Sequence, residues 1–201
     1  MNNEKKAPVL TQSQFKQVVA AARANEHGSR NVALLYFSAA LGLRAKEMSQ
    51  LLVRDALTVD GKIKDEVLLT RATTKGGKQR LVYLTNKDVR RELRAYIEER
   101  RNDERVTLLP TAPLFRSGKG GGFSPNTMQM LFKRLYRAAG LDHASSHSGR
   151  RTFATSLIER GVDIKAVSTL MGHSTVAMTA RYVDDNPIRL RRVCEEISLG
   201  V

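Results

Sequence analysis

Hydrophobic positions along most of the chain recur with the period of an α-helix that buries one face. Residues 11–14 have the spacing of a helix-capping box, and apolar residues follow at helical intervals to about Asn25. Residues 31–41 are apolar nearly all round, which predicts a central buried helix that ends at Gly42. The chain is therefore expected to begin with helices that pack on a central one.

The helical period returns in the second half of the chain. Ser124 and Pro125 provide a helix start, and Met128, Leu131 and Leu135 follow on one inward face. Further helices are expected from residue 44 onward, over residues 86–101, 147–161, 163–172 and 174–182, and over residues 187–199, with Asp163 and Ser174 as caps.

The period changes to that of β-strands between residues 55 and 84. Asp60 and Gly61 form a hairpin-turn signal, and residues 67–70 and 81–84 flank a glycine-rich turn as strand-like segments. Three antiparallel strands are expected here. The predicted fold class is α+β, mainly α-helical with a small three-stranded antiparallel sheet.

The length of 201 residues suits one domain with a full core. We expect a single domain over residues 11–201 and a flexible lead-in over residues 1–10. Lysine and arginine number 34 against 20 aspartate and glutamate residues, so the net charge is +14. This charge predicts an acidic partner, and on charge alone DNA, RNA and anionic membranes all remain open.

Several classes of protein are disfavoured by features that the sequence lacks. It has no long apolar run and no apolar signal core, so we expect a cytoplasmic protein without a membrane partner. The single cysteine, Cys194, excludes an internal disulfide and argues against a thiolate zinc site. No convergent set of acidic residues suits two metal ions, so we expect no metal and no cofactor.

Residues with basic or reactive side chains have ordinary structural interpretations when each is taken alone. Arg44 and Glu47 have the spacing of a surface ion pair, and Tyr182 alone is more often part of a packed helix face. His147 and Arg150 share one face at a helix start, where cations oppose the helix dipole. An anion bound by both side chains would relieve that repulsion.

The glycine-rich turn at residues 75–78 has two competing interpretations. Glycines beside lysines can cradle phosphates, but the spacing does not match a nucleotide-binding P-loop. A lysine carried on a β-turn into a DNA groove fits the pattern better.

Five motifs follow one another along the chain: residues 42–47 (GLRAKE), residues 74–80 (TKGGKQR), His147-x-x-Arg150, residues 170–174 (LMGHS) and Tyr182. In this order they resemble the motifs of the tyrosine recombinases, or phage integrases. The resemblance covers the chain from about Thr11 to its C-terminus. One departure is Gly149, where that family usually carries Leu; the change removes an apolar anchor and touches no chemical group.

The resemblance implies the catalytic-domain fold of that family and a site-specific DNA recombinase that forms a 3′-phosphotyrosine intermediate. Tyr182 would attack the scissile phosphate, and Arg44, Arg150 and His173 would bind its non-bridging oxygens. His147 would accept a proton near Tyr182, Lys75 would protonate the leaving 5′-oxygen, and Glu47 would orient these groups.

The implied partner is double-stranded DNA, bound by a homo-oligomer of two to four copies, with accessory DNA-bending proteins as a further partner class. The protein would then be nucleoid-associated in a bacterium or phage. No separate N-terminal DNA-clamping domain is expected, as in short recombinases that invert promoter segments or in an isolated catalytic domain. Basic residues expected at the DNA are Lys78, Arg80, Lys133, Arg134 and Arg151.

Two alternatives remain beside recombination by integration, excision or inversion. A non-catalytic DNA-binding regulator of the same fold would be favoured by loss of Arg44, Arg150 or Tyr182, and all three are present. A type IB topoisomerase-like enzyme would use the same tyrosine chemistry but would relax DNA as a monomer. Strand exchange between two marked duplexes separates that enzyme from a recombinase.

Overall fold

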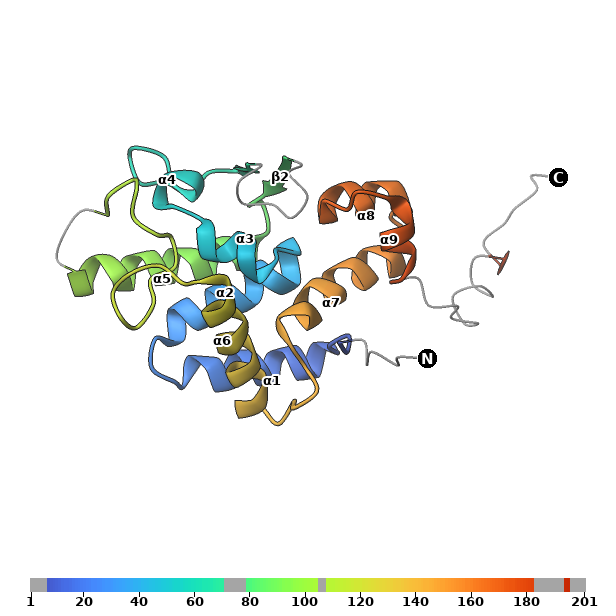
Figure 1. The fold of residues 1–201 in the computed structure, drawn as a ribbon, viewed down its shortest axis with the longest axis horizontal. Coiled ribbons are helices and arrows are strands. Elements are labelled where there is room, and N and C mark those ends of the chain that lie inside the picture. Colours follow the sequence, from blue (N-terminus) through green and yellow to red (C-terminus); the bar gives the residue numbers. More distant parts are fainter. Residues whose placement is uncertain (1–6, 71–78, 105–107, 183–193, 196–201) are drawn as a thin grey trace.

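The computed structural model describes residues 7–70, 79–104, 108–182 and 194–195, and Figure 1 shows their mainly helical arrangement. The helices are α1 (Gln12–Arg23), α2 (Gly28–Leu41), α3 (Ala45–Gln50), α4 (Val53–Ala56), α5 (Lys87–Glu104), α6 (Pro125–Ala138), α7 (Ser146–Glu159), α8 (Ile164–Met171) and α9 (Val176–Ala180). The strands are β1 (Glu66–Leu69) and β2 (Arg80–Tyr83). The expected α+β class, mainly helical with a small antiparallel sheet, is confirmed.

Helix starts follow capping residues that the sequence displays. Thr11 Oγ1 accepts from Gln14 N–H at 3.2 Å, and Gln14 Oε1 accepts from Thr11 N–H at 2.9 Å, so the expected capping box begins α1. Asp163 caps α8 as expected. The expectation that Ser174 caps the following helix is wrong, because the chain extends one residue further and Thr175 is the N-cap of α9.

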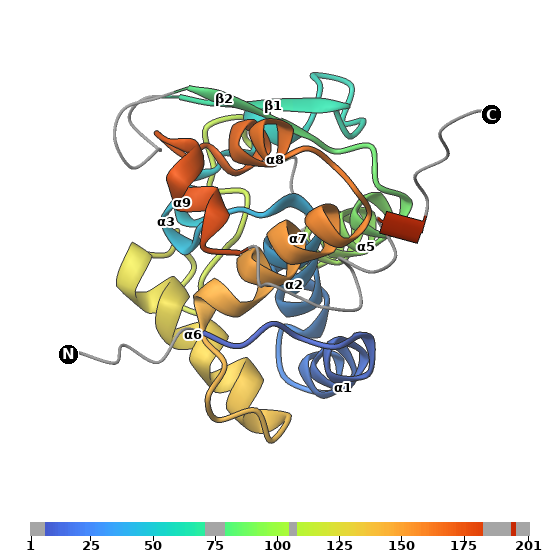
Figure 2. The ribbon, with the colours of Figure 1, turned by 90° about the vertical axis from the view of Figure 1, so that its right-hand side faces the viewer.

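α2 lies at the centre of the fold, and α1, α5 and α7 pack on different sides of it (Figure 1, Figure 2). Most of its side chains are buried, as the apolar sequence of residues 31–41 predicts. Phe37 meets Phe115 edge to face, with ring centroids 5.1 Å apart. This packing holds the C-terminal end of α2, where Gly42 follows, in one position.

Gly149 allows α7 to pack closely on α2. A Cβ atom at this position would collide with the side chain of Ser38 and would approach the backbone of Ala39. The leucine that is usual in the resembling family does not fit this contact. In this chain the two helices therefore approach each other through a glycine instead of an apolar anchor.

β1 and β2 pair as antiparallel strands, with Val67 opposite Val82. Side chains alternate between the two faces, so that Val67 and Val82 are buried while Leu68, Leu81 and Tyr83 are exposed. Figure 2 shows this sheet above α8, and the two elements are in contact.

Only two strands occur in the described part of the sheet, so the expectation of three is wrong in number. The expected turn does form at residues 58–61, but the segments on either side pair at a single bridge between Leu57 and Ile63. Asp55 accepts from Leu52 N–H at 2.8 Å and starts the short helix α4. That helix takes up the residues that a longer strand would need.

The described part of the expected lead-in, residues 7–10, is held against α7. Leu10 is 5% exposed, and its N–H donates to Thr152 Oγ1 at 2.8 Å. Arg151 Nη1 donates to the carbonyl of Ala7 at 3.0 Å. These bonds hold residues 7–10 against α7, within the segment for which the sequence predicts a flexible lead-in.

A second, small apolar cluster joins α7 to α8. Its buried members are Ala154, Ile158, Val167 and Met171, and Tyr182 packs at its edge. Figure 2 shows α7, α8 and α9 facing the viewer. The packing of α7 on α8 places the C-terminal end of α8 beside Gly42, which follows α2.

Candidate active site

The site is organised around the carboxylate of Glu47, which is fully buried in the first turn of α3. Its Oε1 accepts from Arg44 Nη1 at 2.7 Å, and its Oε2 accepts from Arg80 Nη2 at 2.8 Å. Oε2 also accepts from the backbone N–H of Arg44 at 2.8 Å. A buried carboxylate is costly unless it is paired and hydrogen-bonded, and these bonds meet that need.

The pKa of Glu47 reflects this balance of burial and charge. Burial alone would raise it, but attraction to Arg80, the Arg44 backbone N–H and the Arg44 guanidinium hold the pKa of Glu47 below its usual value. Arg150 contributes in the same direction. One carboxylate therefore stays charged among three arginines, which leaves an excess of positive charge around it.

The three arginines, which together with Glu47 are called the arginine cluster below, donate to consecutive carbonyl groups at the C-terminal end of α8. The last carbonyls of a helix lack partners within it, and the helix dipole makes this end negative. The pairs are Arg80 Nη1 with Leu170 O at 2.5 Å, Arg150 Nη2 with Met171 O, and Arg44 Nη2 with Gly172 O at 3.3 Å.

The end of α2 reaches the same place through Gly42. Its carbonyl oxygen accepts from Arg150 Nη1 and, at 3.5 Å, from Arg80 Nη2. Gly172 ends α8 with a φ of 60°, which favours glycine, and a Cβ atom there would collide with the side chain of Arg80. The arginine cluster thus lies where the C-terminal ends of two helices meet.

The members of the cluster differ in how far solvent reaches them. The side chain of Arg44 is 17% exposed, that of Arg80 is 5% exposed, and Arg150 is buried. Burial, and then repulsion from Arg44, lower the pKa of Arg150 from its usual value. A guanidinium stays protonated in proteins, so a nearby anion would relieve the cost that this shift reflects.

His173 links the cluster to Tyr182. Its Nδ1 lies 2.8 Å from Thr179 Oγ1, and its ring stacks on that of Tyr182 with centroids 5.8 Å apart and planes 14° apart. Burial, followed by the charges of Arg150 and Arg44, lowers the pKa of His173 to about 4, so the imidazole is neutral at neutral pH. A pocket of about 500 Å³ between the outer face of the sheet and α8 opens beside His173.

His147 and Arg150 lie at different depths in the first turns of α7. Arg150 is buried in the cluster, whereas the side chain of His147 is at the surface. The expected lysine positions, Lys75 and Lys78, lie outside the described residues. The structure therefore brings Arg44, Glu47, Arg150, His173 and Tyr182 together, while His147 lies one turn away along α7.

Arg80 requires a correction, because the sequence predicts that it contacts DNA at the surface. Its side chain is turned inward, and its guanidinium bonds to Glu47 and Leu170. A basic residue beside a basic turn suggests a surface contact, and only the folded arrangement reveals the buried carboxylate that it meets. Thr179 also lies at the site, and no sequence motif singled it out.

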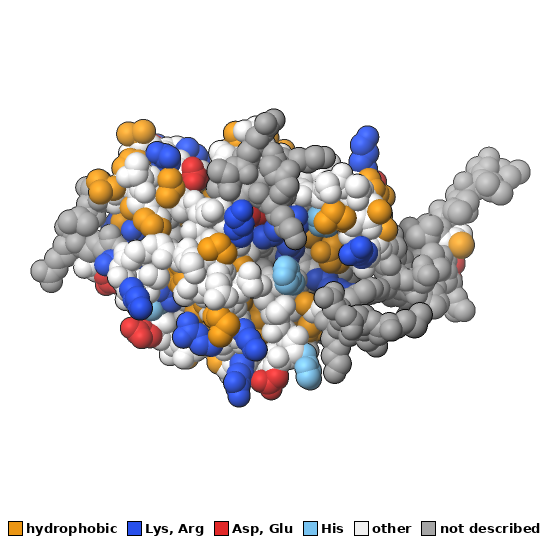
Figure 3. Space-filling model, in the orientation of Figure 1, with side chains coloured by type: hydrophobic (Ala, Val, Ile, Leu, Met, Phe, Trp, Pro, Cys, Tyr) orange, Lys and Arg blue, Asp and Glu red, His pale blue; other side chains and the backbone are white. Residues whose placement is uncertain are grey.

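Other expected DNA contacts lie at or near the surface. Lys133 and Arg134 are exposed on α6, and Arg151 is half-buried near the N-terminal segment. Figure 3 shows that Lys and Arg side chains are more widespread than Asp and Glu side chains on the face it presents. These positions suit contacts with a polyanion.

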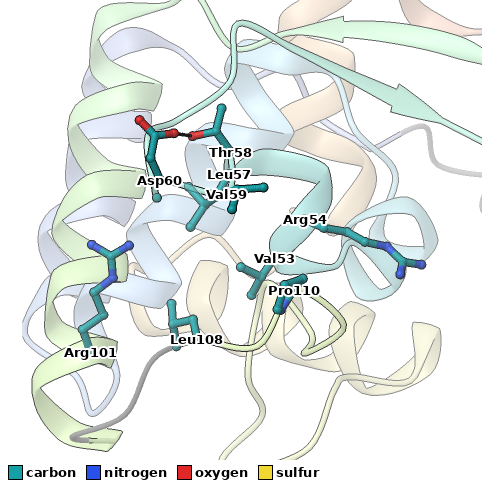
Figure 4. A pocket seen from close by; sticks show the side chains of 10 residues that line it. Val53, Arg54, Leu57, Thr58, Val59, Asp60, Arg101, Leu108 and Pro110 are labelled. Atoms are coloured by element: carbon teal, nitrogen blue, oxygen red, sulfur yellow. Dashed lines mark hydrogen bonds between the residues drawn. The ribbon is translucent and has the colours of Figure 1, made fainter.

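A pocket of about 780 Å³ is lined by none of the cluster's residues (Figure 4). Its wall is largely apolar, with Val53, Leu57 and Leu108 among the lining residues and Arg54 and Arg101 beside them.

Within the described residues, no group of three or more His, Cys, Asp or Glu side chains is placed to hold a metal ion. In that same part of the chain, no helix has the length and apolar character to cross a membrane.

Replacing Glu47 by Gln should destabilise the fold by about 3–5 kcal/mol, because it removes one partner of a buried ion pair. Denaturant unfolding measures this loss. The pKa of Glu47 is lower in the folded than in the unfolded chain, so its contribution is complete above about pH 4.5 and disappears as the pH falls through the folded-state pKa. The difference between the two proteins should accordingly shrink in acid.

The matched control for this change is Asp60→Asn, which removes an exposed partner of Lys62. It should leave the stability nearly unchanged. Equal losses from the two substitutions would contradict the central role of the Glu47 carboxylate.

The sequence of this chain is similar to those of known proteins. The profile of the phage integrase family matches residues 8–189. Tyrosine recombinase XerC of Pelobacter propionicus is 30% identical over 171 residues, which cover 85% of this chain and 52% of that protein. Tyrosine recombinase XerD of Neisseria meningitidis serogroup B is 32% identical over 199 residues, which cover 96% of this chain and 64% of that protein. The chain thus spans about half to two thirds of the length of these relatives.

Solved structures show the same fold. A crystal structure of XerA recombinase matches with a TM-score of 0.73 and 25% identity, covering 94% of this chain and 65% of that one. The Tn1549 transposon integrase in complex with transposon right end DNA matches with a TM-score of 0.71 and 22% identity. The match covers 97% of this chain and 67% of that one.

Proposed function

Because the chain belongs to the phage integrase family, we propose that it is a site-specific DNA recombinase that cleaves and rejoins duplex DNA through a 3′-phosphotyrosine intermediate. The observation that carries this proposal is the arginine cluster at the joined ends of α2 and α8, with His173 and Tyr182 stacked beside it. The names of the similar proteins, which are tyrosine recombinases, support it. The overall reaction would be integration, excision or inversion.

Tyr182 is the proposed nucleophile. Its phenolic oxygen attacks the scissile phosphorus, a new P–O bond forms, and the bond to the 5′-oxygen breaks. The phosphotyrosine ester keeps the energy of the broken bond, so a 5′-hydroxyl of another strand can reverse the step without a cofactor. Stacking on His173 and packing at the edge of the apolar cluster of α7 and α8 orient the phenol ring.

Arg44 and Arg150 would neutralise the charge that develops on the non-bridging oxygens in the transition state. A guanidinium suits this task, because it presents paired donors to a phosphate and remains charged. Arg44 can turn to a phosphate at low cost, since its side chain is the most exposed of the three and its bond to Gly172 O, at 3.3 Å, is the longest of the three bonds to the α8 carbonyls.

Proton transfer is assigned to two further residues. His147 would accept a proton near Tyr182, because imidazole titrates near neutral pH. Lys75 would protonate the leaving 5′-oxygen, and Lys78 would contact the DNA. Both lysines lie outside the described residues, so these two roles rest on the sequence.

Duplex DNA is the proposed partner, bound by two to four copies of the chain. The net charge of +14 favours a polyanion, and Lys133, Arg134 and Arg151 supply basic groups away from the cluster. Contacts between copies are assigned to residues 187–201, whose sequence has an apolar stripe and follows Tyr182 closely.

Replacing Tyr182 by Phe should leave DNA binding unchanged and abolish the covalent protein–DNA adduct, because only the attacking oxygen is lost. Adduct formation is measured on a suicide DNA substrate, with a denaturing gel as the readout. Tyr83→Phe, at an exposed tyrosine of β2, is the control and should form adduct at the normal rate. A persistent adduct in the Tyr182 variant would point to a different nucleophile.

Deleting residues 187–201 should reduce the cooperativity of binding to DNA with two adjacent sites by about tenfold, a common size for coupling between sites. Binding to DNA with one site is the control and should change little. Gel-shift titration measures both. Unchanged cooperativity would sink the assignment of this segment to the contact between copies and would favour a monomeric, topoisomerase-like enzyme.

A further inference from the structure

Thr179 is a buried residue of α9 whose side chain has one hydrogen-bond partner among the described residues. It is fully shielded from solvent, and its Oγ1 lies 2.8 Å from Nδ1 of His173. Threonine hydroxyls in helices commonly donate to a carbonyl of the preceding turn, as Thr169 does to Lys165 O at 3.0 Å. Thr179 uses its hydroxyl on the imidazole instead.

The direction of this hydrogen bond follows from what each group needs. A neutral imidazole carries one N–H, on either Nδ1 or Nε2, and a hydroxyl can donate or accept. If Nδ1–H donated to Thr179, the buried hydroxyl proton would be left without an acceptor among the described residues. If the hydroxyl donates to Nδ1, both groups are satisfied and the imidazole proton lies on Nε2.

We propose that Thr179 is a positioning residue that holds His173 in the Nε2–H tautomer, so that His173 can donate a hydrogen bond to the scissile phosphate. This role rests on the proposed recombinase function. A neutral imidazole with its proton on Nδ1 would instead present a lone pair to the negatively charged oxygens and would repel them. The low pKa of His173, about 4, is consistent with a neutral donor.

Thr179 also connects this donor to the nucleophile. Its carbonyl oxygen accepts from the backbone N–H of Tyr182 at 2.9 Å, while its side chain holds His173, whose ring stacks on Tyr182. One residue therefore fixes the phosphate donor through its hydroxyl and the nucleophile's backbone through its carbonyl. A substitution that removes only the hydroxyl breaks the first link and keeps the second.

Three variants separate these contributions. Thr179→Val keeps the shape of the side chain and removes the hydroxyl, whereas Thr179→Ser keeps the hydroxyl. Thr169→Val is the control, because it removes a helical threonine hydroxyl on α8 whose hydrogen bond, within the described residues, is to Lys165 of its own helix. Thermal unfolding of each variant confirms that it is folded before the other measurements are compared.

The first readout is the ¹⁵N chemical shifts of the His173 ring in the DNA-free protein. The full chain, the Thr179→Ser variant and the Thr169→Val variant should show the Nε2–H tautomer, and the Thr179→Val variant should show a mixture of tautomers. An Nδ1–H tautomer in the full chain, or an unchanged Nε2–H population in folded Thr179→Val, would overturn the assignment. This readout does not depend on DNA cleavage.

The second readout is the rate of covalent adduct formation, compared in a double-mutant cycle with His173→Ala. Thr179→Val should slow the reaction by about tenfold, part of the loss expected when one transition-state hydrogen-bond donor is removed. In the His173→Ala background it should cause no further slowing. An equal slowing in both backgrounds would show that Thr179 does not act through His173. If the full chain shows the Nε2–H tautomer but forms no adduct, the proposed function is overturned instead.

Discussion

The site depends on one constraint, which is that a charged carboxylate has to be kept inside the protein. Glu47 has no exposure to solvent, and its two oxygens are satisfied by Arg44 and Arg80. Without that carboxylate, three guanidinium groups gathered at close range would repel one another. With it, the arginines of a helix start and of a strand start are held in one place, together with Arg150 of α7. The Glu47 carboxylate and its arginine partners thus organise the site, while the apolar core around α2 supplies most of the stability.

The second support comes from the backbone. The C-terminal ends of α2 and α8 present carbonyl groups that lack partners within their helices, and the arginines donate to them. The same donors match the oxygens of a phosphate, so in the proposed reaction a phosphate would replace a carbonyl as the partner of Arg44. Arg80 has less freedom, since its side chain is enclosed by Glu47, Leu170 and Gly172. The cluster therefore combines the enclosed Arg80 and the buried Arg150 with Arg44, whose side chain is the most exposed of the three.

Local signals in the sequence predicted much of this arrangement, and part of what they missed depends on long-range contacts. The caps at Thr11 and Asp163 and the apolar run of α2 depend on neighbouring residues, so their helices could be placed. The inward turn of Arg80 depends on Glu47, which lies far away along the chain. The bond between Thr179 and His173 joins near neighbours across the corner between α8 and α9, and no motif indicates it. The prediction of a third strand was wrong for a local reason. Asp55 accepts from the backbone N–H of Leu52 and starts a helical turn, which the strand-like pattern did not indicate. The anchoring of residues 7–10 on α7 likewise depends on partners far along the chain.

The central claim is that the arginine cluster acts by neutralising the charge of a phosphate. The most direct measurement is the rate of covalent adduct formation on DNA that carries either a normal scissile phosphate or a neutral methylphosphonate at the same position. Arg44→Ala should slow the reaction on the phosphate by about 10²-fold or more, as expected for a lost transition-state donor, and should have a much smaller effect on the methylphosphonate. Arg54→Ala, at an exposed arginine outside the cluster, should change neither rate. An equal slowing of Arg44→Ala on both substrates would contradict the account, because the guanidinium would then not be acting on the phosphate charge.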